Sequence, residues 1–247
     1  MNLSNSESWR FLDDEVAVRN GVANMAVDHT LLESVQTGSA PILRFYRWSE
    51  PTLSLGRNQP AARSDAAVPG RGLVRRPTGG MAVLHHREIT YAIALPAGRL
   101  GGPRATYVTV NRALVAGLRA LGVAASVSPR APRSHFGSVH PCFAEAAEGE
   151  VVAHGKKLVG SAQRYERRAI LQHGSILLGN DQPTGAISLA ELLPELPPVN
   201  EIARIFSASF AQLCGICLAP AELSRREIDR AEELEELYAS EAWTWRR

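Results

Sequence analysis

The three cysteines differ in the chemistry that their surroundings allow. A thiol attacks as its thiolate, and an ordinary thiol with a pKa of about 8.5 needs a nearby cation or base. Cys142 follows Pro141 at the end of an irregular stretch and precedes the strand that leads to the two lysines, so it is the best candidate nucleophile. Cys214 and Cys217 form a C-x-x-C beside an apolar helix, where we expect small buried hydrophobic residues.

The two lysines are distinctive because the chain otherwise uses arginine. Of 27 basic residues, only Lys156 and Lys157 are lysine, and they are adjacent. Lysine is a compact, flexible charge that loses its proton when desolvated, whereas arginine remains a rigid, charged fork. Small residues follow Lys157 and let a ligand lie against the backbone; they are Gly160, Ser161 and Ala162. We therefore expect Lys157 to meet a ligand and Lys156 to lie in an exposed turn.

A second candidate site is the segment RRPTGG at residues 75–80. Gly79 and Gly80 allow close backbone approach and offer amides to an anion, with Arg75 and Arg76 beside them. A simple hairpin turn is the alternative interpretation of a Gly-Gly pair.

Histidines provide weaker indications. His85, His86 and Glu88 suggest a metal site, but adjacent residues of a strand point to opposite faces, and we expect no metal. His173, in the segment QHGS, is either a core histidine with satisfied hydrogen bonds or a residue of the site.

These residues need a scaffold of helices and hairpins. Apolar residues at helical spacing predict helices at residues 22–35, 107–121, 202–213 and 222–239. Alternation predicts strands within residues 41–56, 72–95, 150–153, 158–163 and 170–178, with a turn at His154-Gly155. The stretch from Ala124 to Pro141 has no period and is predicted to be a long loop. The pattern favours an α/β (α+β) fold with a largely antiparallel sheet.

Composition excludes several classes of function. A net charge of +2 excludes a strongly basic nucleic-acid coat, and we expect no nucleic-acid partner. The N-terminus lacks the apolar core of a signal peptide, and no apolar run reaches the roughly 18 residues that cross a bilayer. Three cysteines form no secreted disulfide framework. We expect a reduced, cytoplasmic protein without a membrane partner.

Six stretches resemble parts of a known family, in the family's order, across roughly residues 20–180. They read NMAVDHTLLE, PILRFYRWSEPTLSLGRNQ, VRRPTGGMAVLHHREITYAI, PCF, GKKLVGSAQR and LQHGSILL. The combination of RRPTGG and AVLH with GKKLVGSAQ and LQHGS is specific. On these residues the chain resembles the lipoate/octanoate protein ligases and transferases. One departure is His86, which stands where the family has an acidic residue.

The resemblance implies a fold and a set of site residues. The fold is a biotin/lipoate protein ligase-like sandwich of mixed, largely antiparallel sheets flanked by helices, related to class II synthetases. We expect one catalytic domain over residues 1–247, with closing helices at 198–240. The implied acyl-tunnel residues are Arg75, Arg76, Gly79, Gly80 and His85. Lys157, with Gly160, Ser161 and Ala162, is implied to meet the acyl carbonyl, and His173 is a further substrate-binding candidate.

Within this family, the segment around Cys142 is similar to octanoyltransferases that modify the glycine cleavage H protein. The resemblance implies that Cys142 takes octanoate from acyl carrier protein as a thioester and passes it to a lipoyl-domain lysine, with no cofactor. Basic residues between Arg44 and Arg87 are candidates for steering the acidic carrier protein, although a solvated surface explains them too.

Three alternatives remain. The first is an ATP-dependent lipoate ligase that uses ATP and Mg²⁺, which the segment GRNQ at residues 56–59 favours. The others are an amidotransferase that moves acyl groups between lipoyl domains, and a carrier-protein adaptor without catalytic activity.

Overall fold

The computed structural model describes residues 7–60, 71–129, 146, 148–179, 182 and 185–246. Cys142, the predicted nucleophile, lies outside these residues. The helices and strands are, in chain order, β1 (Ser8–Arg19), α1 (Gly21–Gln36), β2 (Ile42–Trp48), β3 (Thr52–Leu55), β4 (Gly72–Arg75), β5 (Val83–His85), β6 (Glu88–Pro96), α3 (Pro103–Ala120), β7 (Ala125–Val127), β8 (Val151–Ala153), β9 (Lys156–Glu166), β10 (Ala169–Leu177), α4 (Leu189–Leu192), α5 (Val199–Cys214), β11 (Cys217–Pro220), α6 (Arg225–Ala239) and α7 (Glu241–Thr244).

Eight strands form one large sheet in the order β11-β1-β2-β6-β10-β9-β8-β7. β1 is parallel to both β11 and β2, whereas the other neighbouring strands are antiparallel. A small sheet, β4-β3-β5, contains one parallel and one antiparallel pairing. The predicted fold class, mixed and largely antiparallel sheets flanked by helices, is therefore confirmed.

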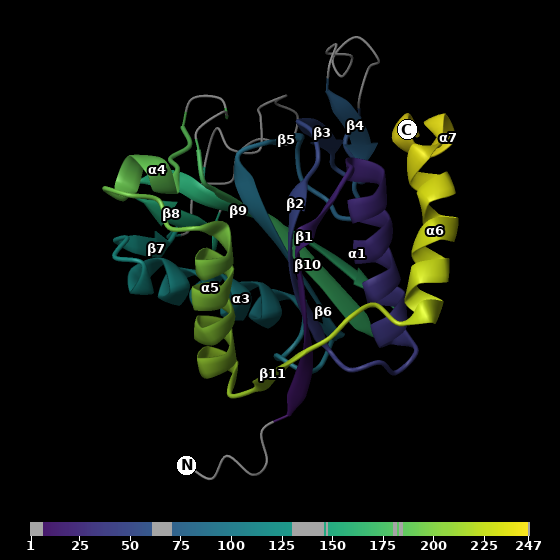
Figure 1. Cartoon of the computed structure of the whole chain (residues 1–247), viewed down its shortest axis with the longest axis horizontal. Coiled ribbons are helices and arrows are strands. Elements are labelled where there is room, and N and C mark those ends of the chain that lie inside the picture. The colour runs from purple at the N-terminus through teal and green to yellow at the C-terminus, as the bar shows by residue number, and fades with distance from the viewer. Residues whose placement is uncertain are drawn as a thin grey trace.

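The large sheet is the middle of three layers, with α1 and α6 on one face and α3 and α5 on the other (Figure 1). Each face has its own core. Leu31 of α1 and Leu234 of α6 belong to one cluster of buried side chains. Val110 of α3 and Phe206 of α5 belong to the other. Burying an apolar stripe of each helix against the sheet supplies the main stabilisation of this arrangement.

The small sheet lies at one end of the large sheet, beside the start of α1 (Figure 1). Its connection to the site depends on a close backbone approach between two glycines. A Cβ at Gly56 would lie 1.8 Å from the carbonyl oxygen of Gly80, and Gly80 itself has φ +88°. Only glycine tolerates these positions, so the segment 75–80 packs directly on the end of β3.

Three strands differ from the sequence-based expectations. β1 occupies residues 8–19, for which the sequence pattern predicts no element, because acidic residues interrupt its alternation. β7 lies at the start of the stretch predicted to be a loop, most of which is outside the described residues. β11 lies between α5 and α6, within the segment 198–240 that was expected to be helical. The assignment of the whole chain to one catalytic domain stays a prediction.

The C-x-x-C cysteines also differ from expectation. Cys214 is half-buried at the last turn of α5, whereas Cys217 is exposed at the beginning of β11. The prediction that both are core residues is wrong, because Gly215 adopts a left-handed conformation (φ +64°) and turns the chain out of the helix to the edge of the sheet. Burial raises the pKa of Cys214 to about 11, so that thiol stays protonated at neutral pH.

Candidate active site

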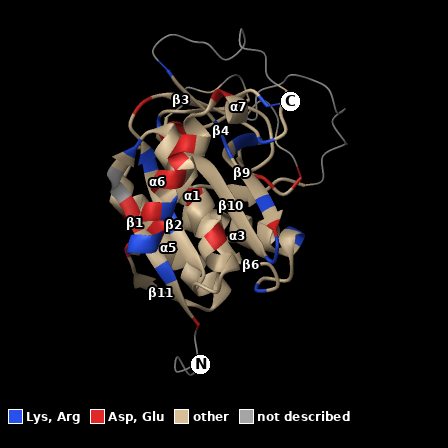
Figure 2. Cartoon of the chain, turned by 90° about the vertical axis from the view of Figure 1, so that its right-hand side faces the viewer, with Lys and Arg blue, Asp and Glu red and all other residues tan. Residues whose placement is uncertain are grey.

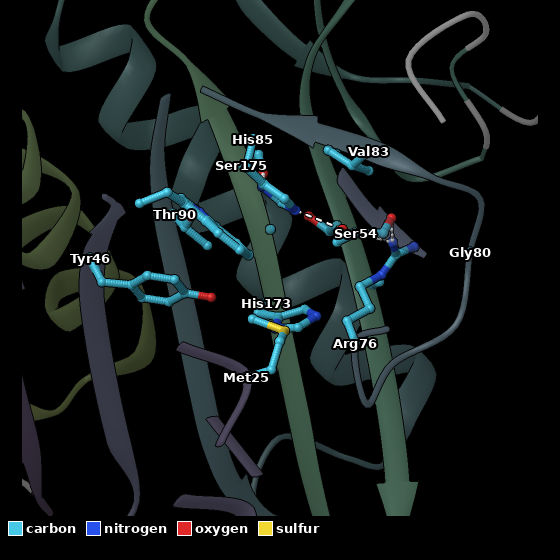
Figure 3. A pocket seen from close by; sticks show the side chains of 15 residues that line it. Met25, Tyr46, Ser54, Arg76, Gly80, Val83, His85, Thr90, His173 and Ser175 are labelled. Carbon is cyan, nitrogen blue, oxygen red and sulfur yellow. Dashed lines mark hydrogen bonds between the residues drawn. The ribbon is translucent and has the colours of Figure 1, made fainter. Parts of the chain in front are cut away.

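A cavity of about 420 Å³ of empty space, its opening included, lies between α1, the large sheet and the small sheet. Figure 3 shows Tyr46, Thr90, His85, Arg76 and His173 arranged around its centre. The lining residues come from eight segments and are Met25, Tyr46, Trp48, Ser54, Arg76, Gly80, Val83, His85, Thr90, Gly160, Ser161, Ala162, His173, Gly174 and Ser175. Segments far apart in sequence therefore build one wall.

One side of the cavity carries a network centred on Glu88. The Oγ of Ser54 lies 2.7 Å from Nε2 of His85, and Nδ1 of His85 lies 2.7 Å from Oε1 of Glu88. The hydroxyls of Thr90 and Ser175 donate to the same carboxylate oxygen, each at 2.7 Å. The indole of Trp48 stacks on His85, with ring centroids 3.9 Å apart, and donates to Thr90. Most polar side-chain atoms of this wall are therefore hydrogen-bonded to one another.

A second network centres on Asp28, which is fully buried. It accepts from Arg44 at 2.6 Å, from Tyr46 at 2.9 Å and from Nδ1 of His173 at 2.8 Å. The other ring nitrogen of His173 lies 2.6 Å from the hydroxyl of Thr78, in the RRPTGG segment.

The pKa values of this second network define its protonation. Burial by itself raises the pKa of Asp28, but the hydrogen bond from His173 and the charge of Arg44 outweigh it, and the net pKa is lowered. Burial lowers the pKa of His173 in spite of Asp28. A neutral His173 therefore donates to the ionised Asp28 and accepts from Thr78, which fixes its tautomer and orientation.

A third network crosses from β10 and β6 through β9 to α3. Gln172 donates to Tyr91 at 3.1 Å, the hydroxyls of Tyr91 and Ser161 lie 2.7 Å apart, and Ser161 donates to Asn111 at 3.1 Å. Burial raises the pKa of Tyr91 to about 12, against the opposing hydrogen bonds from Ser161 and Gln172, so the phenol stays neutral. Gly174 completes this wall, because a Cβ there would lie 2.3 Å from the carbonyl oxygen of Gly160.

These networks determine what the cavity binds. The hydroxyl, imidazole and phenol groups of the lining residues form hydrogen bonds with other side chains of the networks. The surface that they present to the cavity therefore consists mostly of carbon atoms. A ligand that enters gives up water and receives few hydrogen bonds in exchange, so an apolar ligand is favoured. Among the described residues, Oε2 of Glu88 is the one buried side-chain oxygen of these networks without a hydrogen-bond partner.

Lys157 lies beyond this wall, at the start of β9. Its side chain is 2% exposed, and its ammonium donates to Glu150 at 2.7 Å. Asn111, from the third network, donates to the carbonyl of Gly149 at 2.7 Å and so holds the residue before Glu150. Lys156 is exposed in the turn at His154-Gly155, as predicted. The structure thus separates the two adjacent lysines completely.

The predicted site residues fall into three groups. Those that line the cavity are Arg76, Gly80, His85, Gly160, Ser161, Ala162 and His173. Lys157, Arg75 and Gly79 are not among the lining residues. Cys142 lies outside the described residues, so its role stays a prediction.

The two arginines of the RRPTGG segment have different surroundings. Arg76 donates to the carbonyls of Gly79 at 2.6 Å and Met81 at 2.8 Å, and so holds the loop closed from inside. Arg75 points the other way and donates to the carbonyls of Gln59 and Thr244, each at 2.8 Å.

Sequence reasoning missed Asp28 and Glu150 of these networks, and it considered Glu88 only as part of a metal site. Asp28, Glu88 and Glu150 are all buried, and each pairs with a basic or imidazole side chain. Signals were present for two of them: Asp28 lies between the apolar residues Val27 and Leu31 of a predicted helix, and Glu88 lies at the start of a strand that is buried along nearly its whole length. An acidic residue at such a position needs a partner.

The basic stretch from Arg44 to Arg87 is not a continuous surface patch. Arg44 is fully buried between Asp28 and Asp14, and Arg75 and Arg76 are buried as well. The interpretation of this stretch as a steering surface is therefore wrong for these three residues, because their side chains are buried and form no part of the exposed surface.

The histidines at positions 85 and 86 do not come together at one site. His85 is buried and His86 exposed, so the two point apart as predicted. The described residues contain no group of three His, Cys, Asp or Glu side chains arranged to hold a metal ion. Among the described helices, none combines the length and apolar character needed to cross a bilayer.

The chain thus has a three-layer mixed fold with a carbon-lined cavity and a buried lysine on one of the strands that line it. The lipoyl protein ligase A/B catalytic domain matches residues 20–197, and the chain belongs to this family. The prediction of the family, and of an enzyme, is confirmed.

The full chain is similar to proteins called octanoyltransferase LipM. The protein of Kyrpidia tusciae is 34% identical over 98% of this chain and 100% of the relative. That of Symbiobacterium thermophilum is 36% identical over 97% and 99%, and that of Bacillus subtilis 32% over 98% and 99%.

Solved structures share the fold at lower identity. A lipoate-protein ligase A bound with ATP has a TM-score of 0.80 at 23% identity, covering 96% of this chain and 98% of that chain. A bipartite lipoate protein ligase from Thermoplasma acidophilum has a TM-score of 0.75 at 21% identity, covering 97% and 96%. At these identities the likeness concerns the fold.

Proposed function

We propose that the chain is an octanoyltransferase of lipoate biosynthesis. In this proposal, it takes octanoate from octanoyl-acyl carrier protein and delivers it to a lysine of a lipoyl domain, that of the glycine cleavage H protein. The observation that carries the proposal is identity of 30–36% to proteins called octanoyltransferase LipM over nearly the whole length of both chains. It requires a reduced thiol, which fits a cytoplasmic location.

The cavity supports an acyl substrate. Each methylene transferred from water to an apolar site contributes about 0.8 kcal/mol, so the six methylenes of an octanoyl chain contribute about 5 kcal/mol. Ser54, His85 and Thr90 present carbon to the space because their polar atoms are engaged with one another. The chain length that fits best remains for experiment to define.

The proposed reaction proceeds through a thioester on Cys142. Its thiolate attacks the carbonyl carbon of the octanoyl thioester; the carrier's thiol leaves and takes up a proton. The neutral amine of the acceptor lysine then attacks the acyl-enzyme, the C–S bond breaks, and the amine loses a proton as the amide forms. Thioester exchange is near balance and amide formation is downhill, so the proposal includes no ATP, metal or other cofactor.

We assign Lys157 to stabilising charge in these steps. In the proposal, its ammonium favours the Cys142 thiolate or polarises the acyl carbonyl, and backbone amides of the Gly79-Gly80 turn supply the oxyanion donors. Glu150, which holds the Lys157 ammonium at 2.7 Å, is the positioning residue. The cysteine is eight positions before Glu150 in sequence.

An ATP-dependent lipoate ligase is the second candidate. It is favoured by the shared fold with a lipoate-protein ligase A bound with ATP. It requires AMP formation that depends on lipoate and ATP and that survives Cys142→Ser. An amidotransferase between lipoyl domains would retain the cysteine but would not accept octanoyl carrier protein.

The decisive experiment is intact-mass measurement after incubation with octanoyl carrier protein. We expect an octanoyl adduct on the wild type, none on Cys142→Ala, and an undiminished adduct on the matched control Cys217→Ser, whose exposed thiol lies at the edge strand β11. Addition of a lipoyl domain should discharge the adduct and modify one lysine. Absence of any adduct, together with ATP-dependent modification of the lipoyl domain, would establish the ligase instead.

A further inference from the structure

Four arginines from distant parts of the chain gather on one side of the cavity. They are Arg57 after β3, Arg75 at the end of β4, Arg164 near the end of β9 and Arg246 after α7, and we call them the arginine cluster. Trp243 lies between two of them, 3.9 Å below the guanidinium of Arg246 and 5.8 Å from that of Arg57. Figure 2 shows basic segments beside β4 and next to the C-terminal end.

The charges of the arginine cluster are poorly compensated. Burial and then the charge of Arg57 lower the pKa of Arg164, and burial followed by Arg57 and Arg75 lowers the pKa of Arg246. Among the described residues, Glu166 is the one carboxylate that forms an ion pair with a member of the cluster, and its partner is Arg164. Like charges thus repel one another in the cluster, with one ion-paired carboxylate among the described residues.

Two guanidinium nitrogens of the cluster are buried without a hydrogen-bond partner among the described residues: Nη1 of Arg57 and Nη2 of Arg75. The side chain of Arg75 is completely buried, and its other nitrogens donate to backbone carbonyls of Gly56, Gln59 and Thr244. These bonds fix its direction and leave one donor unused. A buried charged donor without an acceptor is costly, which indicates a site prepared for an anion.

The arginine cluster adjoins the acyl cavity. On β9, Ala162 lines the cavity, and Arg164 lies two residues further on the same face of the strand. On α1, Met25 lines the cavity, and His29 lies one turn further, with Nε2 3.4 Å from Nη1 of Arg164. The amide of Arg57 donates to the carbonyl of Thr78 at 2.7 Å, and the Thr78 hydroxyl contacts the cavity residue His173.

The histidine at this junction adds no charge of its own at neutral pH. Burial, and then the charge of Arg164, lower the pKa of His29 to about 4. The positive potential therefore comes from the arginines, and Glu33, which lies 3.7 Å from His29, is the other acidic group at this position. An occupant of both regions has an apolar part in the cavity and an anionic part at the arginines.

We propose that the arginine cluster binds the phosphate group of the acyl donor. The inference rests on the proposed function, because an octanoyl thioester of phosphopantetheine has an apolar chain at one end and a phosphate at the other. Guanidinium forks match phosphate oxygens, and two preoriented donors lower the cost of binding. The same phosphate chemistry occurs in carrier-bound phosphopantetheine and in coenzyme A.

The test compares two small donors that differ by one phosphate: octanoyl-pantetheine and octanoyl-4′-phosphopantetheine. Their affinities are measured by calorimetry on the full chain carrying Cys142→Ala, so that neither donor is consumed. We expect the phosphorylated donor to bind about tenfold more tightly, as one good charge-assisted contact provides. Adding Arg57→Gln and Arg246→Gln should bring the ratio of affinities close to one.

A matched control is Arg225→Gln, which removes the same charge from the other end of α6, where the arginine is 82% exposed and pairs with Asp229. It should keep the ratio of the parent. Equal binding of both donors to the parent would overturn the phosphate site, as would a ratio unchanged by the arginine substitutions. Because binding is measured, a failure of octanoyl transfer in the mass experiment is a separate result.

Two further donors identify the source of the phosphate. Octanoyl carrier protein and octanoyl coenzyme A are titrated against the parent and the arginine double variant. A loss of affinity about tenfold larger for one of them identifies that donor as the one whose phosphate reaches the cluster. Losses below twofold for both would overturn the assignment of the cluster to the acyl donor.

Discussion

Beside the cavity, two buried pairs of side chains bring opposite charges together. Asp28 faces Arg44 at 2.6 Å, and Glu150 faces Lys157 at 2.7 Å. The arginine cluster lies a short distance further along β9 and α1 and brings four guanidiniums together. Among the described residues, Glu166 is the carboxylate that forms an ion pair with it. The two regions share neighbouring strands but differ in how their buried charge is compensated.

This difference separates two kinds of binding surface. A buried ion pair with further hydrogen bonds needs nothing from a ligand, so the paired region offers its carbon surface to an apolar chain. Uncompensated like charges are unfavourable until an anion arrives, so the arginine cluster is prepared for one. If ion pairing accounts for the difference between the two regions, substitutions of paired and of unpaired charges have different effects on activity and stability.

The largest effect is expected from Lys157→Arg. The substitution keeps the charge but places a larger, planar group in a fully enclosed position beside Glu150, and activity should fall at least about 100-fold, as when a charge-stabilising catalytic group is lost. Lys156→Arg, in the exposed turn, should leave the rate unchanged. The rate of octanoyl transfer and the melting temperature are measured together. Equal rates for the two variants would remove Lys157 from the site.

The second prediction concerns Asp28→Asn. Removing the charge of this carboxylate takes from Arg44 one of its two acidic partners, leaves it Asp14, and weakens the hydrogen bond from His173, so we expect a loss of about 2–3 kcal/mol in the free energy of unfolding. Denaturant titration measures this change. The control Asp229→Asn, at an exposed ion pair, should change stability by less than about 0.5 kcal/mol. Similar losses of unfolding free energy for both variants would show that the buried pairing of Asp28 contributes no more than an exposed ion pair.

The third prediction uses pH on a paired carboxylate outside the cavity. Glu227 accepts from Arg10 at 2.6 and 2.8 Å and caps α6 with Ser224. Burial alone raises its pKa, but Arg10 and the Ser224 backbone lower it to about 2 from 4.5.

Because the folded pKa lies below the unfolded one, the stabilisation is complete above about pH 4.5 and is lost as the pH falls toward 2. Glu227→Gln should cost about 2 kcal/mol at pH 7, with a difference from wild type that shrinks over this range. Thermal melts from pH 7 to 2.5 check this, and a difference independent of pH would contradict it.

The smallest expected effect is on stability, which should not fall as it does in the other variants. Arg57→Gln removes one of the mutually repelling charges, so without ligand we expect stability to be unchanged or raised by up to about 0.5 kcal/mol. Salt should raise the stability of the wild type relative to the variant, because screening weakens repulsion. Melting curves at low and high salt measure this. A clear loss of stability would mean that Arg57 is paired, and the contrast between the regions would disappear.

The sequence predicted elements whose cause is local. The helical spacing at residues 22–35 and 107–121 corresponds to α1 and α3, and the alternation at 170–178 corresponds to β10. Strand β1 escaped prediction because Asp14 interrupts its apolar pattern. That carboxylate is compensated by Arg44 on β2, 30 residues away, which local pattern does not reveal.

In the candidate site, too, local features were predicted from the sequence, and contacts between distant segments were not. The exposure of Lys156 was predicted correctly, because the glycine turn before it is a local signal, whereas the role of Lys157 at a ligand stays a prediction. The Asp28–His173 pair spans 145 positions, and the Ser54–His85 pair joins β3 to β5. Their meeting depends on strand register and on which helix covers which face.

The amino-acid sequence by itself determined the family, the types of most elements and the difference between Lys156 and Lys157. The tertiary structure alone decided which charges are paired. Arg44 and Arg57 look equivalent in sequence, but Arg44 meets Asp14 and Asp28. Arg57 meets other arginines beside Trp243. The physical reason is that the energy of a buried charge depends on the neighbours that folding brings within a few ångströms, and those neighbours come from distant segments.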